Sequence, residues 1–352
     1  MPAWRVLLVL EALTTPSSRL RGLSHVPALR EAGFEVDVID VPRSPLARSA
    51  RFAALARYDV AVIQKKLLHR WDLWLVARRT RRLIYDFDDA VTVGPYGTAE
   101  DPRRAALLAE TLARCDAVIA GNEELARYAA GHANVRVIPT GVDPKAYLVK
   151  SPTRADGREA AVVIGWIGTR GNLRYVEMLG PVFKALAERG LSVRLRVVSD
   201  GTPEALGMPV ESTPWTLERE ADDLVGLDIG VMPLDDTAWS RGKCGFKLLQ
   251  YMAAGLPAVA SPVGVNRSII QHGENGLLAD TPEEWGEALA QLIQQPARRA
   301  QLGGAARRTV ETQYSLARCS EAFVAVLREV CETRPVRRPS VPAMGSKEVV
   351  NV

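Results

Sequence analysis

The chain has 352 residues, 47% of them hydrophobic, which is enough for more than one sizeable core, and ordinary domain sizes favour two domains over one. Its 45 lysines and arginines exceed its 41 acidic residues so slightly that the formal charge of +4 gives no argument for nucleic-acid binding. Four cysteines without a Cys-x-x-Cys pair exclude a zinc pattern and a dense disulfide framework, and they fit a reducing cytoplasm. No segment approaches the ~20 apolar residues of a membrane-spanning helix, and the apolar start has the length of a strand rather than of an export signal.

The first third of the chain reads as alternating strands and helices. Arg5–Leu10 is a buried strand, Arg19–Ala32 has helical spacing that ends at Gly33, and Phe34–Ile39 returns to a strand pattern. Further strands are expected at Val60–Gln64, Leu83–Asp86, Ala117–Ala120 and Val135–Ile138, between helix-like stretches such as Arg104–Arg114 and Glu123–Ala130. Such alternation predicts a parallel sheet that helices cover on both faces.

A basic stretch lies within this region. Between Arg43 and Arg82 the many lysines and arginines are opposed only by two aspartates, and Trp71 and Trp74 lie among them. Such a face can meet an anionic lipid surface or a phosphate-bearing acceptor. A solvated basic helix explains the pattern equally well, so both interpretations stay open.

The alternating pattern stops at Pro139–Pro144, and the polar stretch Lys150–Glu159 has the composition of a linker. A second series follows, with strands at Ala161–Trp166, Val193–Ser199, Asp228–Met232 and Ala258–Ala260, a helix at Leu173–Arg189 and a long amphipathic helix at Ser315–Cys331. The polar remainder from Arg334 to Val352 is expected to be disordered.

The chain thus divides into four predicted parts. Residues 1–150 form an N-terminal Rossmann-like domain, and residues 151–312 form a C-terminal Rossmann-like domain. Residues 313–332 form a helix that can pack back on the N-terminal domain, and 333–352 form the tail. The predicted fold class is α/β, with two doubly wound sheets that face a cleft, since such sheets bind ligands beyond the carboxyl ends of their strands.

The densest group of candidate site residues lies at the start of a helix. Gly242 and Gly245 would let backbone N–H groups approach an anion, and the helix that begins near Phe246 would add its positive N-terminal end. Lys243 and Lys247 lie four residues apart there, a spacing that is unfavourable for two like charges unless an anion lies beside them. A diphosphate is the natural candidate, and lysines in water on a surface helix are the alternative.

The segment Leu248–Ser261, LLQYMAAGLPAVAS, and the following Asn275–Leu278, NGLL, resemble the retaining glycosyltransferases of the two-Rossmann-domain (GT-B) type, family four, also called group 1. In that family the helix usually carries two glutamates separated by seven residues, and the second holds the donor ribose. Here Gly242 and Gln250 take those places. Gln250 can still accept and donate hydrogen bonds, and the resemblance leaves more of the donor-side role to the two lysines.

A second segment that carries the resemblance is the glycine-rich turn within Val163–Asn172, which follows a predicted strand. In the family this turn carries an arginine and then a lysine that neutralise the leaving diphosphate. Thr169 takes the arginine place and Arg174 the lysine place, with Arg170 as a nearby substitute. The resulting donor-binding set is Gly168, Thr169, Ser199, Asp200, Gly201, Trp215, Gly245, Phe246 and Gln250.

The acceptor side is predicted from polar residues at the ends of N-terminal strands. Tyr85–Asp89 closes a strand with three carboxylates, a local pattern that mimics the metal-binding pair of the other main glycosyltransferase fold. Because paired lysines can neutralise a diphosphate without a divalent ion, we predict no metal and no other cofactor. The acceptor-side set is Arg19, Arg21, Asp86, Asp88, Asp89 and Asn122, with helix capping or buried hydrogen bonding as the alternative for the carboxylates.

The predicted function is metal-independent transfer of a sugar from a nucleoside-diphosphate sugar to a hydroxyl acceptor, with retention, in polysaccharide or glycoconjugate synthesis. Lys243, Lys247 and an arginine at 170 or 174 would stabilise the charge of the leaving diphosphate. The alternatives are a non-catalytic nucleotide-sugar-binding protein and a sugar-nucleotide epimerase of the same fold. The expected location is the cytoplasm, with a peripheral contact at the anionic inner face of the membrane left open and no nucleic-acid partner.

Overall fold

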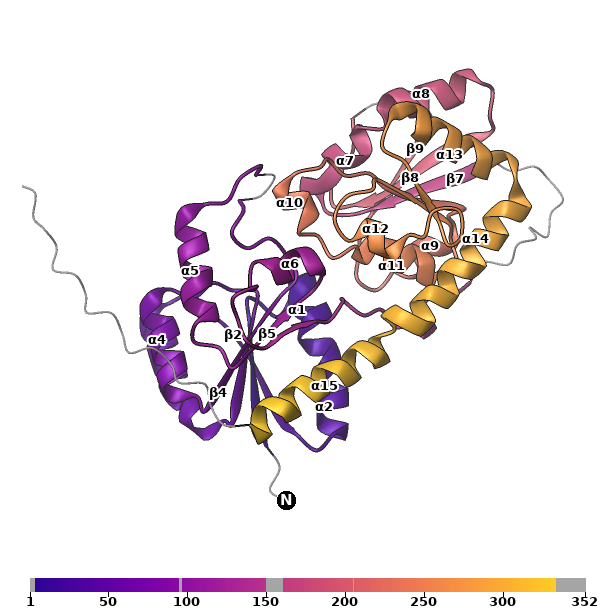
Figure 1. Cartoon of the computed structure of the whole chain (residues 1–352). Helices are drawn as coiled ribbons and strands as arrows, with labels where there is room; N and C mark the ends of the chain where they lie inside the picture. The colour runs from indigo at the N-terminus through magenta and orange to yellow at the C-terminus, as the bar shows by residue number, and fades with distance from the viewer. Residues whose placement is uncertain (1–3, 95–96, 150–160, 205, 334–352) are drawn as a thin grey trace, which may run out of the picture.

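The computed structural model describes residues 4–94, 97–149, 161–204 and 206–333. These residues form two six-stranded, wholly parallel sheets with the orders β2-β1-β3-β4-β5-β6 and β12-β11-β10-β7-β8-β9. Helices cover both sheets, which form two bodies joined at one side (Figure 1). The predicted fold class, two Rossmann-like doubly wound sheets, is confirmed.

The four inner strands of the N-terminal sheet are buried almost throughout, as their apolar runs require, whereas its two edge strands are partly exposed. Its strands are β1 (Arg5–Leu10), β2 (Glu35–Asp40), β3 (Val60–Gln64), β4 (Arg82–Phe87), β5 (Ala117–Ala120) and β6 (Val135–Val137). The helices between them are α1 (Pro16–Arg21), α2 (Val26–Glu31), α3 (Pro45–Ala53), α4 (Arg70–Arg79), α5 (Pro102–Leu112) and α6 (Glu123–Arg127).

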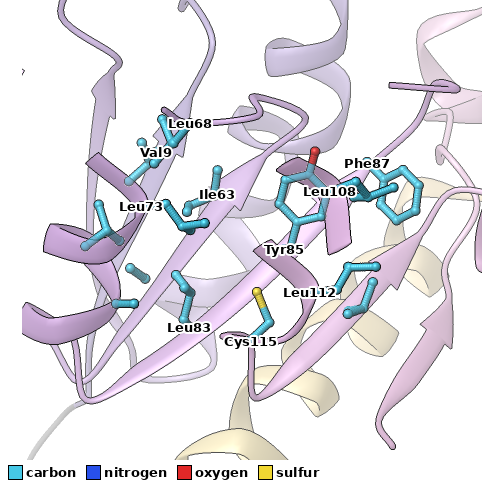
Figure 2. Close-up of a cluster of buried hydrophobic side chains, with 14 of the residues drawn as sticks. Val9, Ile63, Leu68, Leu73, Leu83, Tyr85, Phe87, Leu108, Leu112 and Cys115 are labelled. Atoms are coloured by element: carbon cyan, nitrogen blue, oxygen red, sulfur yellow. The ribbon is translucent and has the colours of Figure 1, made fainter. Parts of the chain in front are cut away.

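One face of this sheet packs on α3, α4 and α5. Figure 2 shows part of this core, where Ile63 and Tyr85 from the sheet lie among side chains such as Leu73 of α4 and Leu112 of α5. The predicted helix Arg19–Ala32 is divided into α1, a short 3-10 turn at Leu23–His25, and α2. The reason is Pro27, which cannot donate a backbone hydrogen bond to the preceding turn.

The C-terminal sheet has the same architecture. Its strands are β7 (Val162–Ile167), β8 (Val193–Ser199), β9 (Val210–Pro214), β10 (Ile229–Met232), β11 (Ala258–Ala260) and β12 (Leu277–Leu278). Its helices are α7 (Leu173–Glu177), α8 (Gly180–Glu188), α9 (Asp222–Val225), α10 (Ala238–Arg241), α11 (Phe246–Ala253), α12 (Asn266–Ile269), α13 (Pro282–Gln294) and α14 (Pro296–Thr309). Pro181 divides the predicted helix Leu173–Arg189 into α7 and α8 for the same reason as above.

The last helix, α15 (Leu316–Glu332), returns to the N-terminal domain. It packs on α2 and on the face of the sheet opposite α4 (Figure 1), where the buried Phe323 ring stacks on His25 with 4.6 Å between the ring centroids. The two chain segments that cross between the domains bond to each other, because Val142 N donates to Tyr314 O at 3.0 Å and Leu316 N donates to Val142 O at 2.8 Å.

Two predicted segments, the linker at 150–159 and the tail from residue 334, lie outside the described residues. Within the described part of the chain, no helix combines the length and the apolar composition needed to span a bilayer.

Candidate functional site

The two lysines at the start of α11 lie at the carboxyl edge of the C-terminal sheet. Gly245 precedes the helix with φ of 68°, a left-handed conformation that glycine adopts without strain. The ammonium of Lys247 lies 4.5 Å from the centre of the Trp166 ring. It also lies against Gly168, where a Cβ atom would come within 2.7 Å of Nζ. Gly168 thus leaves the space that the ammonium occupies.

Lys247 is held in surroundings that disfavour its charge. Burial, together with the neighbouring Lys243 ammonium, lowers the pKa of Lys247 to about 7. Within the described part of the chain, no carboxylate opposes this shift. Two ammonium groups lie close together here, and one of them has no carboxylate beside it. Such a site is suited to bind an anion.

Lys243 occupies a cradle of aromatic rings. Its Nζ lies 5.6 Å from the centre of the Tyr175 ring and 5.1 Å from that of Trp239. Burial lowers its pKa, and the Asp89 carboxylate from the other domain opposes that shift. Lys243 is therefore placed between the aromatic wall of its own domain and a carboxylate of the opposite domain.

The two candidate arginines, Arg170 and Arg174, have different surroundings. Arg174 forms an ion pair with Asp235 at 2.6 Å and lies over the Tyr175 ring at 4.7 Å. Arg170 is exposed, and its backbone N–H donates to the Asp200 carboxylate. Its side-chain stem crosses Gly201, where a Cβ atom would come within 2.6 Å of Arg170 Cγ. Of the two, Arg170 has the more accessible guanidinium.

The remaining predicted donor residues surround this group. The Ser199 hydroxyl accepts from Gly201 N at 3.2 Å, and the Thr169 hydroxyl accepts from Asn172 Nδ2 at 2.8 Å. Phe246 is the first residue of α11. These contacts fix the turns that follow β7 and β8 beside the lysines.

Gln250 and Trp215 lie together on the side toward the chain crossing. Gln250 is buried and donates to the Tyr147 hydroxyl at 3.3 Å. Trp215 Nε1 donates to Glu220 at 3.0 Å, and the Arg19 guanidinium of the N-terminal domain lies 6.0 Å from the centre of its ring. Trp215 is thus a contact between the domains in this structure.

Two predicted acceptor-side residues lie below the surface. Arg21 and Asp86 are both buried and form an ion pair with each other, and Arg21 Nη1 donates to Ile138 O at 2.6 Å. Burial, only partly opposed by Arg21, raises the pKa of Asp86 to about 6. As they lie, neither side chain can reach an acceptor. The buried hydrogen-bonding role considered for the carboxylates is the one that Asp86 has.

Asp88 and Asp89 lie at the domain junction with three partners that sequence reasoning missed. The Ser17 hydroxyl donates to Asp88 at 2.6 Å and accepts from Gln64 Nε2 at 2.7 Å. Lys65 pairs with Asp89, and it holds a left-handed φ of 60° that is uncommon for a lysine. Their place in the chain could have revealed two of these partners. Gln64 and Lys65 come at the carboxyl end of β3, and β3 is the neighbour of β4 in the sheet.

The loop that carries Lys243 binds directly to the N-terminal domain. Asn122, which caps α6, donates to Lys243 O at 2.9 Å. The Cys244 thiol donates to Asp88 O at 3.2 Å. A Cβ atom on Gly242 would come within 2.6 Å of Ala90 Cβ, so the glycine permits this close approach. The Lys243 loop and the segment that carries Asp88 and Asp89 are therefore held together across the junction.

Part of the chain is similar in sequence to known glycosyltransferases. Residues 161–295 match the family model described as glycosyl transferases group 1. A D-inositol 3-phosphate glycosyltransferase from Thermobispora bispora is 33% identical over 33% of this chain and 27% of its own length. One of the same name from Xylanimonas cellulosilytica is 25% identical over 76% of this chain and 69% of its own. The chain spans 27% and 44% of the first two curated relatives that it matches.

Solved structures show the same fold. Sucrose-phosphate synthase from Thermosynechococcus elongatus superposes with a TM-score of 0.75 at 17% identity and covers 93% of this chain and 98% of its own. Anabaena HepE in complex with UDP superposes with a TM-score of 0.70 at 16% identity, over 92% of this chain and 100% of its own. The chain has the GT-B fold of glycosyltransferases. More particularly, its residues 161–295 match the group 1 glycosyltransferase family model, in agreement with the resemblance seen in the sequence.

Proposed function

We propose that the protein transfers a sugar from a nucleoside-diphosphate sugar to a hydroxyl acceptor with retention of the anomeric configuration. The observation that carries this proposal is the pair Lys243 and Lys247. Two ammonium groups are crowded at the start of α11, and burial lowers the pKa of both. A diphosphate between or beside them would supply the negative charge that the described residues do not give to Lys247.

The chemistry follows from where charge develops. When the bond from the anomeric carbon to the diphosphate oxygen breaks, the electron pair leaves with the diphosphate and the sugar gains oxocarbenium character. The two lysines, with Arg170 at the adjacent turn, would stabilise the departing charge. The acceptor oxygen then bonds to the anomeric carbon on the face that the diphosphate has left, and its proton passes to a diphosphate oxygen.

The acceptor would bind on the N-terminal side of the junction. Asp88 and its partner Ser17 are half-buried beside the Lys243 loop, and a hydroxyl of the acceptor could replace one of their mutual hydrogen bonds. Arg19 lies at the same junction, over Trp215. We assign acceptor binding to Arg19, Asp88 and Asp89, and leave Arg21 and Asp86 a supporting role beneath them.

We also propose that the reaction needs no metal ion. The carboxylates of the Tyr85–Asp89 segment are already engaged, Asp86 by Arg21, Asp88 by Ser17 and Asp89 by Lys65. A divalent ion would have to displace these partners. The expected location is the cytoplasm, which the four free cysteines support.

The experiment is a thermal-shift panel of nucleoside diphosphates and their sugars, first without metal and then with magnesium. We expect one nucleotide to stabilise the wild type, with about 2.7 kcal/mol of stabilisation at a ligand concentration a hundred times Kd. Lys243→Met and Lys247→Met should lose most of this effect. Lys184→Met, an exposed lysine of α8, is the matched control and should keep it.

Two other outcomes would favour a different function, and a third would contradict the donor site. Binding without any release of nucleoside diphosphate would favour the non-catalytic binding protein, which the replacement of a glutamate by the buried Gln250 also supports. Conversion of the sugar nucleotide without an acceptor would favour the epimerase. The donor site would be contradicted if Lys184→Met lost as much of the nucleotide stabilisation as the other two variants. It would also be contradicted if no nucleotide stabilised the wild type.

A further inference from the structure

Three large apolar side chains are exposed at one edge of the N-terminal domain. Leu13 is 45% exposed, Leu46 is 84% exposed and Trp71 is 58% exposed. Each follows the carboxyl end of a different strand, since Leu13 comes after β1, Leu46 lies in the first turn of α3 after β2, and Trp71 lies in the first turn of α4 after β3. These strands are neighbours in the order β2-β1-β3, so the three side chains lie along one stretch of sheet edge. We call them the apolar rim.

The structure holds the rim in place. Arg48 of α3 pairs with the buried Asp72 of α4 at 2.7 Å. Leu46 is two residues from Arg48, and Trp71 adjoins Asp72, so this ion pair brings the two helix starts together. The Trp71 ring stacks on Trp74 with 4.7 Å between centroids. Leu46 and Trp71 thus lie on two helix starts that an ion pair joins.

The surface beside the rim is basic. Arg43 and Arg51 are exposed, and within the described part of the chain neither forms an ion pair. Lys66 and Arg70 also lie next to the rim, each paired with one glutamate. Asp40 is exposed at the end of β2 and opposes this charge in part. The net field along the rim favours an anionic partner.

We propose that the apolar rim docks on an anionic lipid bilayer. Single apolar side chains on neighbouring segments, flanked by arginines, suit shallow insertion between lipid headgroups. A tryptophan is favoured at that depth because its ring is apolar and its indole N–H is polar. The three side chains come from three separate segments, one loop and two helix starts, whereas a protein interface packs a continuous core.

The position of the rim has a consequence for the acceptor. The rim lies at the carboxyl edge of the sheet, the same edge that carries Ser17, Asp88 and Asp89. If the proposed transfer holds, the acceptor would be carried on a lipid and would enter the junction from the membrane surface. Only this consequence rests on the proposed function, whereas the docking itself does not.

The test is cosedimentation of the full chain with vesicles, without donor or acceptor. We expect binding to vesicles of equal parts phosphatidylglycerol and phosphatidylcholine, weakened by salt, and little binding to pure phosphatidylcholine. Arg43→Gln with Arg51→Gln should weaken binding about 25-fold, because each basic residue near an anionic surface contributes about fivefold to the affinity. Leu13→Asn, Leu46→Asn and Trp71→Ser together should weaken it at least as much.

The matched control places the same changes on the other domain. Met178 is an exposed apolar residue there and Arg189 an exposed basic one, and Met178→Asn with Arg189→Gln should bind vesicles as the wild type does. The nucleotide thermal shift of every variant should be unchanged, which separates this proposal from that of the donor site. Absence of anionic-vesicle binding, or equal binding by the rim variant, would overturn the proposal. So would self-association that the rim variant abolishes while vesicle binding is absent, because the rim would then be an interface between two copies.

Discussion

At the scale of single residues, the surroundings of Lys247 disfavour its positive charge. It is a lysine placed over a tryptophan ring and beside a second ammonium, where burial and Lys243 together lower its pKa to about 7. Such an arrangement costs stability in the ligand-free protein. It is expected where a site is prepared for charge that the ligand brings.

The pH dependence of Lys247 can be predicted with its sign. Its pKa is about 7 in the folded protein and about 10.4 when unfolded. The unfolded state therefore holds the proton over this range, and the free energy of unfolding of the ligand-free protein should rise between pH 7 and about 10. Affinity for a sugar nucleotide, whose diphosphate does not titrate there, should fall over the same range. Thermal melts and calorimetry measure the two trends.

Lys247→Met should remove both trends, whereas Lys184→Met should keep them. A wild-type affinity that stays constant from pH 6 to 9 would show that the charge of Lys247 does not contribute to donor binding.

Residue-scale features could be predicted from the sequence only where the spacing is local. Lys243 and Lys247 lie four apart at a helix start, so their proximity follows from helix geometry. The aromatic cradle could not be predicted, because Tyr175, Trp239 and Lys243 come from three separate elements. The Arg21–Asp86 pair was missed for a related reason: both residues were recognised at strand ends, but only the fold shows that they face each other below the surface.

At the scale of elements, the loop before α11 is the main link between the domains near the site. It binds the N-terminal domain through Asn122 and through the Cys244 thiol, and Gly242 lies against Ala90. The same loop carries Lys243. The contact between the domains and the charge of Lys243 therefore depend on the same few consecutive residues.

Gly242→Val should push this loop away from the N-terminal domain, because a Cβ atom would come within 2.6 Å of Ala90 Cβ and 2.8 Å of its backbone N. Displacement by about 1 Å can reduce the rate of a positioned reaction about 100-fold. We expect release of nucleoside diphosphate from the donor to fall by about that factor, while nucleotide affinity falls less than tenfold, since Lys247 stays on α11. The two quantities are measured by a product assay and by calorimetry.

Gly286→Ala on α13 is the control, because its Cβ would meet nothing within 4 Å. If Gly242→Val reduced affinity and turnover equally, the glycine would serve the donor site itself rather than the contact between the domains.

The sequence pattern did not predict every boundary of the helices and strands. Apolar periodicity continues through Pro27 and Pro181, so one helix was predicted in each place where the chain forms two. Strand β9 has only exposed and half-exposed residues, because it is the edge of its sheet, and it carries no apolar run to reveal it. Buried strands such as β3 and β7 were found because helices cover both of their faces.

At the scale of the whole molecule, α15 ties the end of the described chain to its beginning. The helix comes after the C-terminal domain but completes the core of the N-terminal one, with Phe323, Leu327 and Val330 buried against α2 and the sheet. Burial lowers the pKa of His25 to about 3, so the ring that stacks on Phe323 is neutral. The N-terminal domain is therefore built from two distant pieces of sequence.

Phe323→Ala should lower the free energy of unfolding of the N-terminal domain by about 3–5 kcal/mol, because it leaves a cavity in that core. Hydrogen exchange should become faster in β1 and β3 and change little in β7 and β8, which α15 does not cover. Leu217→Ala, at an exposed site, is the control and should leave both domains unchanged. Faster exchange in both sheets together would mean that the two domains unfold as one unit.

The overall architecture was the part most open to prediction, because strand and helix alternation repeats over the whole chain and determines a parallel sheet in each half. How the halves meet depends on contacts such as Asn122 with Lys243 and Arg19 with Trp215, which join residues more than a hundred positions apart. No pattern within either half encodes those distances.

The return of α15 has a consequence for how the protein is made. A ribosome releases β1 to β6 first, yet the helix that covers one face of that sheet is synthesised only after the second domain is complete. The first domain to emerge should therefore be the last to finish folding, and its apolar surface around Leu29 and Phe34 must wait, exposed or held by a chaperone, until about two hundred further residues have been added.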